Sequence, residues 1–412
     1  MLSLISARVI LVGKLLLRLM YYFYKLELTR EEEDMLNGEH GESLAVAYRI
    51  LLAIGEATGA SKLVPVKWAH ISGVNYNTIG DSGVKFLEEF SKTGRVAIRT
   101  TINPMGYDKG RIENLSDRFL KKQSSIVNSY SMLGAIPSFT CVPYEIFDIP
   151  EKGSMVSFAE SSAAVFSNSI LGLSTNRESA LSALASSISG KTPYSDLLIE
   201  NFRQAKVAIR PDFTPSTELD YGLLGYFAGN AVKDPCVAFI PPEGRPNRIQ
   251  AKALSAAIGT SGSCGMFTFG HGSGREIVSF GKEEAARVKD ELSTRDDGDL
   301  IALGGPQLGL SELSLLSSLI EGKKLKKRCM IFCARAIHRQ AKEIGLVNRI
   351  EKAGGEFMCD SCTCMTPLIT RADFDSVITN SIKAAYYLDR SNSIGVALKD
   401  LRTIVKDYSE NN

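Results

Sequence analysis

The stretch Asp299-Leu-Ile-Ala-Leu303, followed by Ser311-Glu-Leu-Ser-Leu-Leu-Ser-Ser-Leu-Ile320 and Cys329-Met-Ile-Phe-Cys-Ala334, decides the fold class. The first and third segments are short apolar runs typical of buried strands, and the second has apolar residues at helical spacing. A strand, a helix and a strand in this order predict a parallel sheet with the helix on one face. The fold is therefore expected to be α/β.

The same alternation continues on both sides of this stretch. Thr29 and Glu32 stand in the order of a capping box, which predicts a helix beginning at Arg30. Periodicity predicts further helices at Leu44–Thr58, Ile79–Thr93, Lys282–Leu292 and Ala336–Ile344, and strands at Val96–Ile102, Glu276–Phe280 and Glu356–Met358. The chain thus reads as α/β lobes over residues 25–285 and a C-terminal βαβ lobe over residues 286–412.

Length and composition exclude several classes of protein. A chain of 412 residues exceeds one hydrophobic core, and a formal charge of +2 gives no field that would favour nucleic acid or an anionic membrane. The 8 cysteines are scattered, which favours reduced thiols or metal ligands and a cytoplasmic location. Residues 1–24 are apolar but interrupted by charges, and we interpret them as an N-terminal extension outside the fold.

Three unusual loops follow predicted strands, where parallel sheets bind their ligands. They are Thr101-Ile-Asn-Pro104, Gly304-Gly-Pro-Gln307 and Cys359-Asp-Ser-Cys-Thr-Cys364, and we expect them to meet in one cleft. The cysteine loop is compatible with zinc, a redox dithiol or an iron–sulfur group. Zinc is disfavoured because none of the 4 histidines lies in a ligand pair.

The remaining cysteines and the small-residue segments have structural interpretations. Isolated Cys236, Cys329 and Cys333 are expected to be buried packing residues. The glycine-rich segment 259–274 lacks the ending of a phosphate-binding P-loop and is interpreted as turns. Ser154 to Ser189, crowded with serine and alanine, suggests closely packed helices.

One long motif carries a family resemblance. Glu160-Ser-Ser-Ala-Ala-Val-Phe-Ser-Asn-Ser-Ile-Leu-Gly172, continued by Thr175-Asn-Arg-Glu178 and Gly190-Lys-Thr-Pro-Tyr194, resembles the signature of the aconitase X large subunit. Further matching segments are Ala69–Gly80, Thr100–Pro104, Leu133–Pro137, Thr140–Tyr144, Asp360–Cys362, Pro367–Leu368 and Asn380–Tyr387. The resemblance extends from about Leu26 to the C-terminus.

The resemblance implies three aconitase-like α/β domains around a cleft, without the fourth, swivelling domain. A separate small subunit would then supply that domain and, with it, the serine that acts as the general base. The implied reaction is an iron-dependent dehydration next to a carboxylate, in which a base removes the α proton and the metal assists the departing hydroxide.

The resemblance also places the ligands of a 4Fe–4S cluster at Cys141, Gly305 and Cys362, and this chain departs from it at one of them. The family pattern Gly-Cys-Pro-His reads Gly304-Gly-Pro-Gln307 here, and glycine has no side chain that could bind metal. Three alternatives stay open. Cys364 or Cys359 supplies the third thiolate, the chain holds a smaller iron centre, or the chain is an inactive scaffold that binds the small subunit.

The expected substrate contacts also follow from the resemblance, and they are Gly73, Val74, Asn75, Asn103, Pro104, Glu160, Ser161, Asn380 and Ser381. Arg335, in the loop after its strand, is a candidate clamp for an anionic substrate. Lys67 and His70 are interpreted as orienting the first motif rather than transferring protons.

The subgroup resemblance indicates the substrate class. A stand-alone large subunit of the archaeal type implies dehydration of (R)-5-phosphomevalonate to trans-anhydromevalonate 5-phosphate, in the mevalonate pathway to isoprenoids. The alternative is a dehydratase of cis-3-hydroxy-L-proline. Both reactions remove water next to a carboxylate.

Overall fold

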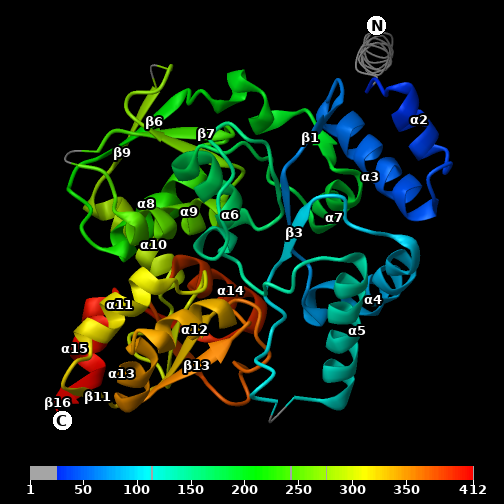
Figure 1. The fold of residues 1–412 in the computed structure, drawn as a ribbon. Coiled ribbons are helices and arrows are strands. Elements are labelled where there is room, and N and C mark those ends of the chain that lie inside the picture. Colours follow the sequence, from blue (N-terminus) through cyan, green and yellow to red (C-terminus); the bar gives the residue numbers. More distant parts are fainter. Residues whose placement is uncertain (1–25, 113–114, 242–243, 275, 412) are drawn as a thin grey trace, which may run out of the picture.

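The computed structural model describes residues 26–112, 115–241, 244–274 and 276–411. The expected N-terminal extension, residues 1–24, lies outside the described residues. Figure 1 shows three α/β lobes, coloured blue to green, green to yellow-green, and yellow to red in chain order. Among the described residues, no helix has the length and apolar character needed to cross a membrane.

The first lobe surrounds a parallel sheet of order β3-β2-β4 and an antiparallel pair β1-β5. Its capping box is confirmed, because Thr29 accepts a hydrogen bond from the Glu32 amide and the Glu32 carboxylate accepts one from the Thr29 amide. Its elements are α2 (Arg30–Leu36), α3 (Glu42–Thr58), β1 (Leu63–Pro65), β2 (Trp68–Ile71), α4 (Tyr76–Thr93), β3 (Arg99–Ile102), α5 (Asp117–Leu133), β4 (Ser157–Phe158), α6 (Ser161–Phe166), α7 (Ala180–Ser189) and β5 (Lys191–Pro193).

The second lobe has a four-stranded parallel sheet of order β8-β7-β6-β9. Helices α8 and α9 pack closely against each other in the green region of Figure 1. Its elements are β6 (Val207–Pro211), α8 (Glu218–Ala231), β7 (Cys236–Phe239), α9 (Arg248–Ser261), β8 (Met266–Phe269), β9 (Glu276–Phe280) and α10 (Lys282–Leu292). The segment 259–274, interpreted as turns, therefore also contains the end of α9 and strand β8.

The third lobe is built on a five-stranded parallel sheet of order β13-β12-β10-β14-β15. The predicted strand–helix–strand unit is β10-α11-β12, with the two strands adjacent in the sheet. The elements are β10 (Leu300–Leu303), α11 (Leu310–Leu319), β11 (Lys323–Leu325), β12 (Arg328–Cys333), α12 (Arg335–Glu343), α13 (Leu346–Lys352), β13 (Gly355–Cys359), β14 (Ser376–Thr379), α14 (Ile382–Asn392), β15 (Gly395–Leu398), α15 (Leu401–Tyr408) and β16 (Ser409–Asn411).

β9 and β10 are consecutive strands but belong to different sheets. β9 pairs with β6 along its whole length, whereas β10, the next strand in the chain, pairs with β12 and β14. Helix α10 therefore connects two sheets and does not cross over within one. Residue 285, where we divided the chain, lies inside this helix, and that division stays a prediction.

The small residues of the central segment allow close packing between lobes. Ala163 and Ala164 of α6 and Ala183 and Ala185 of α7 are fully buried, as the composition of this segment suggested. A Cβ atom on Gly259 of α9 would lie 3.0 Å from the main chain of Ser161, at the start of α6. A single apolar core runs from Trp68 through α6, α8 and α9 to α14, so the lobes share buried surface.

Candidate active site

A cavity of about 870 Å³ lies where the lobes meet. Loops after β2 and β3, the start of α6, the end of α9 and the cysteine loop after β13 form its walls. Its lining includes these residues that the sequence singled out: Gly73, Val74, Asn75, Asn103, Pro104, Cys141, Glu160, Ser161, Cys362 and Cys364. The structure therefore brings residues from distant parts of the chain to one site, as ligand binding at the carboxyl ends of parallel strands requires.

Asn75 connects the first lobe to the cysteine loop. Its side-chain oxygen accepts a hydrogen bond from the Asn77 amide at 2.9 Å, and its side-chain nitrogen donates to the Met365 carbonyl at 2.7 Å. Gly106, in the left-handed region at φ 93°, leaves room for this amide, because a Cβ there would lie 2.3 Å from its nitrogen. Both polar atoms of the Asn75 side chain, which was expected to contact substrate, therefore hydrogen-bond to the protein in this conformation.

A chain of buried hydrogen bonds leads to the cavity from the β2–β3 pair. His70, fully buried, lies 2.8 Å from the Thr101 hydroxyl and 2.7 Å from the Asn103 side-chain oxygen. Because the amide oxygen can only accept, Nε2 of neutral His70 carries the proton and Nδ1 accepts from Thr101. Asn103 in turn donates to Glu160 at 2.8 Å. His70 thus orients Asn103, in agreement with the interpretation that it positions its loop.

The electrostatics support an orienting role for His70. Burial lowers the pKa of His70 to about 4, although the charge of Glu160 and the hydrogen bond with Asn103 oppose this change. The imidazole is therefore neutral at physiological pH.

Glu160 and Lys383 form an ion pair buried at the cavity wall, with side chains only 9% and 8% exposed. Burial would raise the pKa of Glu160, but the Lys383 ammonium and hydrogen bonds from Asn103 and Ser162 together lower it to about 2. Burial likewise disfavours the charged form of Lys383, yet Glu160 and the neighbouring thiols raise its pKa above the usual value. Both groups are therefore ionised at neutral pH.

Three buried thiols line the cavity near this pair. Cys141, Cys362 and Cys364 are 2%, 7% and 2% exposed, and all three line the same cavity. Burial raises the pKa of Cys141, as does its hydrogen bond with Cys362, while the charge of Lys383 lowers it. A hydrogen bond with Cys141 lowers the pKa of Cys362, but the Cys364 thiol and burial outweigh this effect, so the pKa is raised overall. The Lys383 ammonium opposes this rise, but the pKa of both thiols stays above the ordinary value of a cysteine.

The fourth cysteine of this region faces a different neighbour. Cys359 lies opposite Cys333 in the β12–β13 pair, and the Cys359 thiol raises the pKa of Cys333. Both are buried, as are Cys236 and Cys329, in line with the packing role expected for Cys236, Cys329 and Cys333. Of the two candidates for a third thiolate, Cys364 is therefore the one that lines the cavity with Cys141 and Cys362.

The donor set fits a group bound by thiolates. Across the described residues, no three His, Cys, Asp or Glu side chains already converge as a ligand set around one point. The three thiols nevertheless line one cavity, and soft thiolates are the ligands that iron–sulfur groups use.

Gly305, Asn380 and Ser381 lie on the other side of Lys383, in a separate small cavity of about 50 Å³. Ser381 caps α14, and its hydroxyl donates to the Gly305 carbonyl. Asn380 donates to the Glu218 carboxylate at 3.1 Å. A Cβ on Gly305 would lie 2.8 Å from the Ala384 Cβ, so local packing occupies the space that a side chain at 305 would need.

Arg335 lies apart from both cavities, at the start of α12. Its guanidinium pairs with Asp108 and, at 2.8 Å, with Asp360. Asp108 also accepts hydrogen bonds from the amides of Gly110 and Cys359. Arg335 thus fastens the loop after β3 to the loop after β13.

Sequence reasoning missed several residues of the site, of which Lys383 is the most informative. Lys383 lies within the motif Asn380–Tyr387, flanked by Ile382 and Ala384. A lysine in the apolar first turn of a helix was the available signal, because lysine is rarely buried unless it is paired. Further cavity residues that the sequence did not single out are Arg177, Thr260, Ser263 and Tyr387.

The three lobes and this cavity define a protein of the aconitase type. Family models named Aconitase X first, second and third domain match residues 25–201, 205–296 and 298–410. The chain belongs to the aconitase X family, which confirms the resemblance seen in the sequence and the three-domain α/β fold.

Individual relatives agree with this assignment. The phosphomevalonate dehydratase large subunit of Methanocaldococcus jannaschii is 36% identical over 92% of this chain and 99% of the relative. The cis-3-hydroxy-L-proline dehydratase of Hypocrea jecorina is 31% identical over 88% of this chain and 65% of the relative. The crystal structure of Thermococcus kodakaraensis aconitase X in its holo-form matches with a TM-score of 0.86 and 33% identity, covering 93% of this chain and 100% of that one.

Proposed function

We propose that this chain is the catalytic large subunit of a hydro-lyase that dehydrates (R)-5-phosphomevalonate to trans-anhydromevalonate 5-phosphate in isoprenoid biosynthesis. The observation that carries the proposal is the full-length similarity to archaeal phosphomevalonate dehydratase large subunits, at 36% and 35% identity over 99% of two of them. The relatives that act on cis-3-hydroxy-L-proline are 31% and 30% identical, and this chain covers 65% of their length.

The proposed cofactor is an iron–sulfur group held by Cys141, Cys362 and Cys364. These thiols share the cavity with most of the residues expected to contact substrate, whereas Cys359 lies opposite Cys333 between two strands. When bound, such a group supplies an iron that acts as a Lewis acid on the leaving hydroxide. Position 305 needs no thiolate in this arrangement.

The other cavity residues hold the substrate in the proposed mechanism. Lys383 and Arg177 give the cavity two cationic side chains, which favour a substrate that carries carboxylate and phosphate groups. Glu160 keeps Lys383 charged and fixes Asn103 through a hydrogen bond.

The general base is proposed to come from a separate small subunit that carries the swivel domain. That base removes the proton from the carbon next to the carboxylate, and hydroxide leaves from the adjacent carbon, so one water molecule is released per substrate. The relatives' names as large subunits support a two-chain enzyme. The proposed cytoplasmic location rests on the scattered cysteines of the sequence.

The decisive experiment co-expresses the chain with its small subunit, purifies the complex without oxygen and measures iron content and substrate turnover. Formation of anhydromevalonate 5-phosphate is followed by nuclear magnetic resonance, with cis-3-hydroxy-L-proline assayed in parallel. We expect iron, turnover of the phosphorylated substrate, and loss of both in Cys364→Ser but not in Cys359→Ser. Turnover of the proline alone would replace the proposed substrate, and a stable complex without iron or turnover would indicate an inactive scaffold.

A further inference from the structure

Gln307 lies at the junction of the three domains, with a side chain that is fully buried although it is polar. Its amide oxygen accepts a hydrogen bond from the Cys141 amide at 3.2 Å. Its amide nitrogen donates to the carbonyls of Phe139 at 3.2 Å and Ser361 at 2.7 Å. The opposite amide orientation would place like groups against each other, so the three partners fix how the side chain is oriented.

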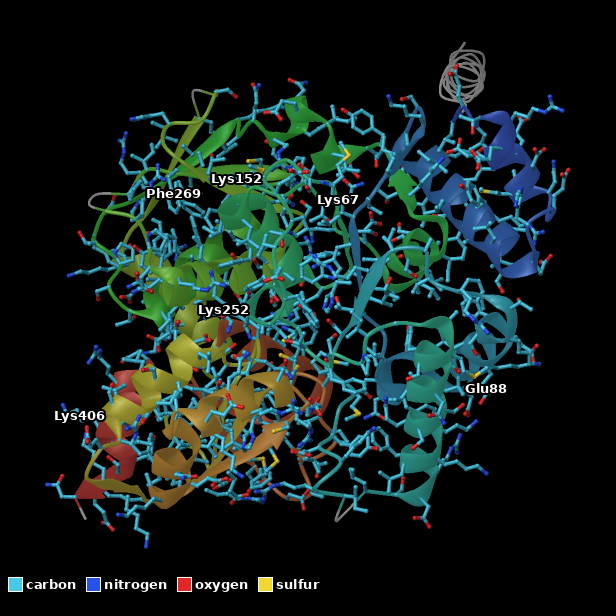
Figure 2. The ribbon with its side chains drawn as sticks, viewed as in Figure 1. Lys67, Glu88, Lys152, Lys252, Phe269 and Lys406 are labelled. Atoms are coloured by element: carbon cyan, nitrogen blue, oxygen red, sulfur yellow. The ribbon has the colours of Figure 1, made fainter. Side chains whose placement is uncertain are left out.

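The main chain of Gln307 is held equally firmly. Its amide donates to the Cys141 sulfur at 3.2 Å, and its carbonyl accepts from the Lys252 ammonium at 2.6 Å. Lys252, on α9, is 2% exposed and also pairs with Glu312 at 2.5 Å. Figure 2 labels Lys252 between the green helices of the second domain and the yellow helix α11 of the third.

These contacts join one segment from each domain to a single residue. Phe139 and Cys141 belong to the first domain, Lys252 to the second and Ser361 to the third. Cys362, next to Ser361, lines the same cavity as Cys141. The distance between the two cysteine loops therefore depends on the amide that bridges them, because their facing carbonyls cannot bond to each other.

We infer that Gln307 is the positioning residue that holds the Cys141 and Cys362 loops at the separation that a shared ligand group requires. What the thiols hold rests on the proposed function, whereas the positioning itself does not. Without the Gln307 amide, the Cys141 N–H and the carbonyls of Phe139 and Ser361 would be buried without partners, so the loops would move to reach water or each other. The fixed spacing between the Cys141 and Cys362 thiols would be lost, in addition to some stability of the chain.

The test compares Gln307→Glu with the unchanged chain. Glutamate keeps the shape and the acceptor for the Cys141 amide but replaces the two donated hydrogen bonds with repulsion between oxygens. The rate of alkylation is measured for each cysteine by mass spectrometry, with the full chain both free and in complex with the small subunit. Alkylation of Cys141 and Cys362 is expected to rise by about tenfold, as loss of buried hydrogen bonds favours local opening, while that of Cys236 and Cys329 stays unchanged.

A second readout follows the bound group directly. Reconstitution with iron and sulfide is followed by the visible absorbance per chain. The affinity for the bound group is expected to fall by about tenfold in Gln307→Glu, the usual effect of removing a residue that orients metal ligands. If the unchanged chain binds no iron and turns over no substrate, the proposed function fails, yet the alkylation rates still decide the positioning role.

The matched control is Asn168→Asp. Asn168 is also buried, donates to the carbonyls of Thr175 and Gly265, and accepts from the Thr175 amide. The control variant is expected to lose thermal stability without faster alkylation of Cys141 or Cys362. Equal alkylation in both variants, or unchanged alkylation in Gln307→Glu, would overturn the inference.

Discussion

Replacing Glu160 with glutamine is expected to lower the free energy of unfolding at neutral pH by about 3 kcal/mol. The pKa of Glu160 falls from 4.5 to about 2 in the folded chain, because Lys383, Asn103 and Ser162 outweigh the opposing effect of burial. Each unit of this difference corresponds to about 1.4 kcal/mol in favour of the ionised form. Glutamine resembles the neutral form and leaves Lys383 buried without an anion.

The sign of the pH dependence follows from the direction of the shift. A carboxyl group whose pKa is lowered by folding contributes its stability above pH 4.5, and the contribution disappears as the pH falls through about 2. The difference between the unchanged chain and Glu160→Gln is therefore expected to be largest above pH 4.5 and to shrink below it. Urea unfolding at a series of pH values, monitored by circular dichroism, measures this difference.

Two further variants control the experiment. Glu151→Gln removes an ion pair between two exposed side chains, Glu151 at 76% and Lys67 at 56% exposed. This variant should leave stability nearly unchanged. The double variant Glu160→Gln, Lys383→Met should recover much of the loss, because it removes the unpaired charge as well. The reasoning is refuted if Glu160→Gln is as stable as Glu151→Gln at pH 7, or if its deficit does not shrink in acid.

Three other predictions concern residues around the site. Burial lowers the pKa of His70 to about 4, so stability should fall as the pH drops from about 6.5 toward 4; His70→Gln should flatten this dependence in urea unfolding, and an equal slope would contradict it. Gly305→Ala should lower the free energy of unfolding by about 1–3 kcal/mol, because the added methyl group would collide with Ala384. The double variant Gly305→Ala, Ala384→Gly should recover part of this loss, whereas a fully stable single variant would show that the space is free. Arg335→Met should destabilise the chain by about 1–3 kcal/mol by leaving Asp108 and Asp360 without their cation, while KM stays unchanged; a raised KM without a stability loss would instead support the role of substrate clamp.

Local patterns predicted the elements well where neighbouring residues decide them. The capping box of Thr29 and Glu32 marks a helix start through bonds within one turn, and the apolar runs of β10 and β12 need only burial on both faces to form strands. The motif that begins at Glu160 identified the family, because ordered identities along the chain do not depend on knowing the structure. The sheet to which β9 belongs could not be predicted this way, since pairing with β6 is a contact between distant residues.

The sequence by itself determined the α/β class, the family and the loops that carry the site, because these depend on local periodicity and on the order of residues. Only the tertiary structure decided how those residues act together. It placed Cys364 in the cavity and Cys359 against Cys333, gave Asp108 and Asp360 to Arg335, and brought Lys383 to Glu160 across the chain. Hydrogen bonds and ion pairs act over a few ångströms, so which group meets which is settled by packing between domains that no local pattern records.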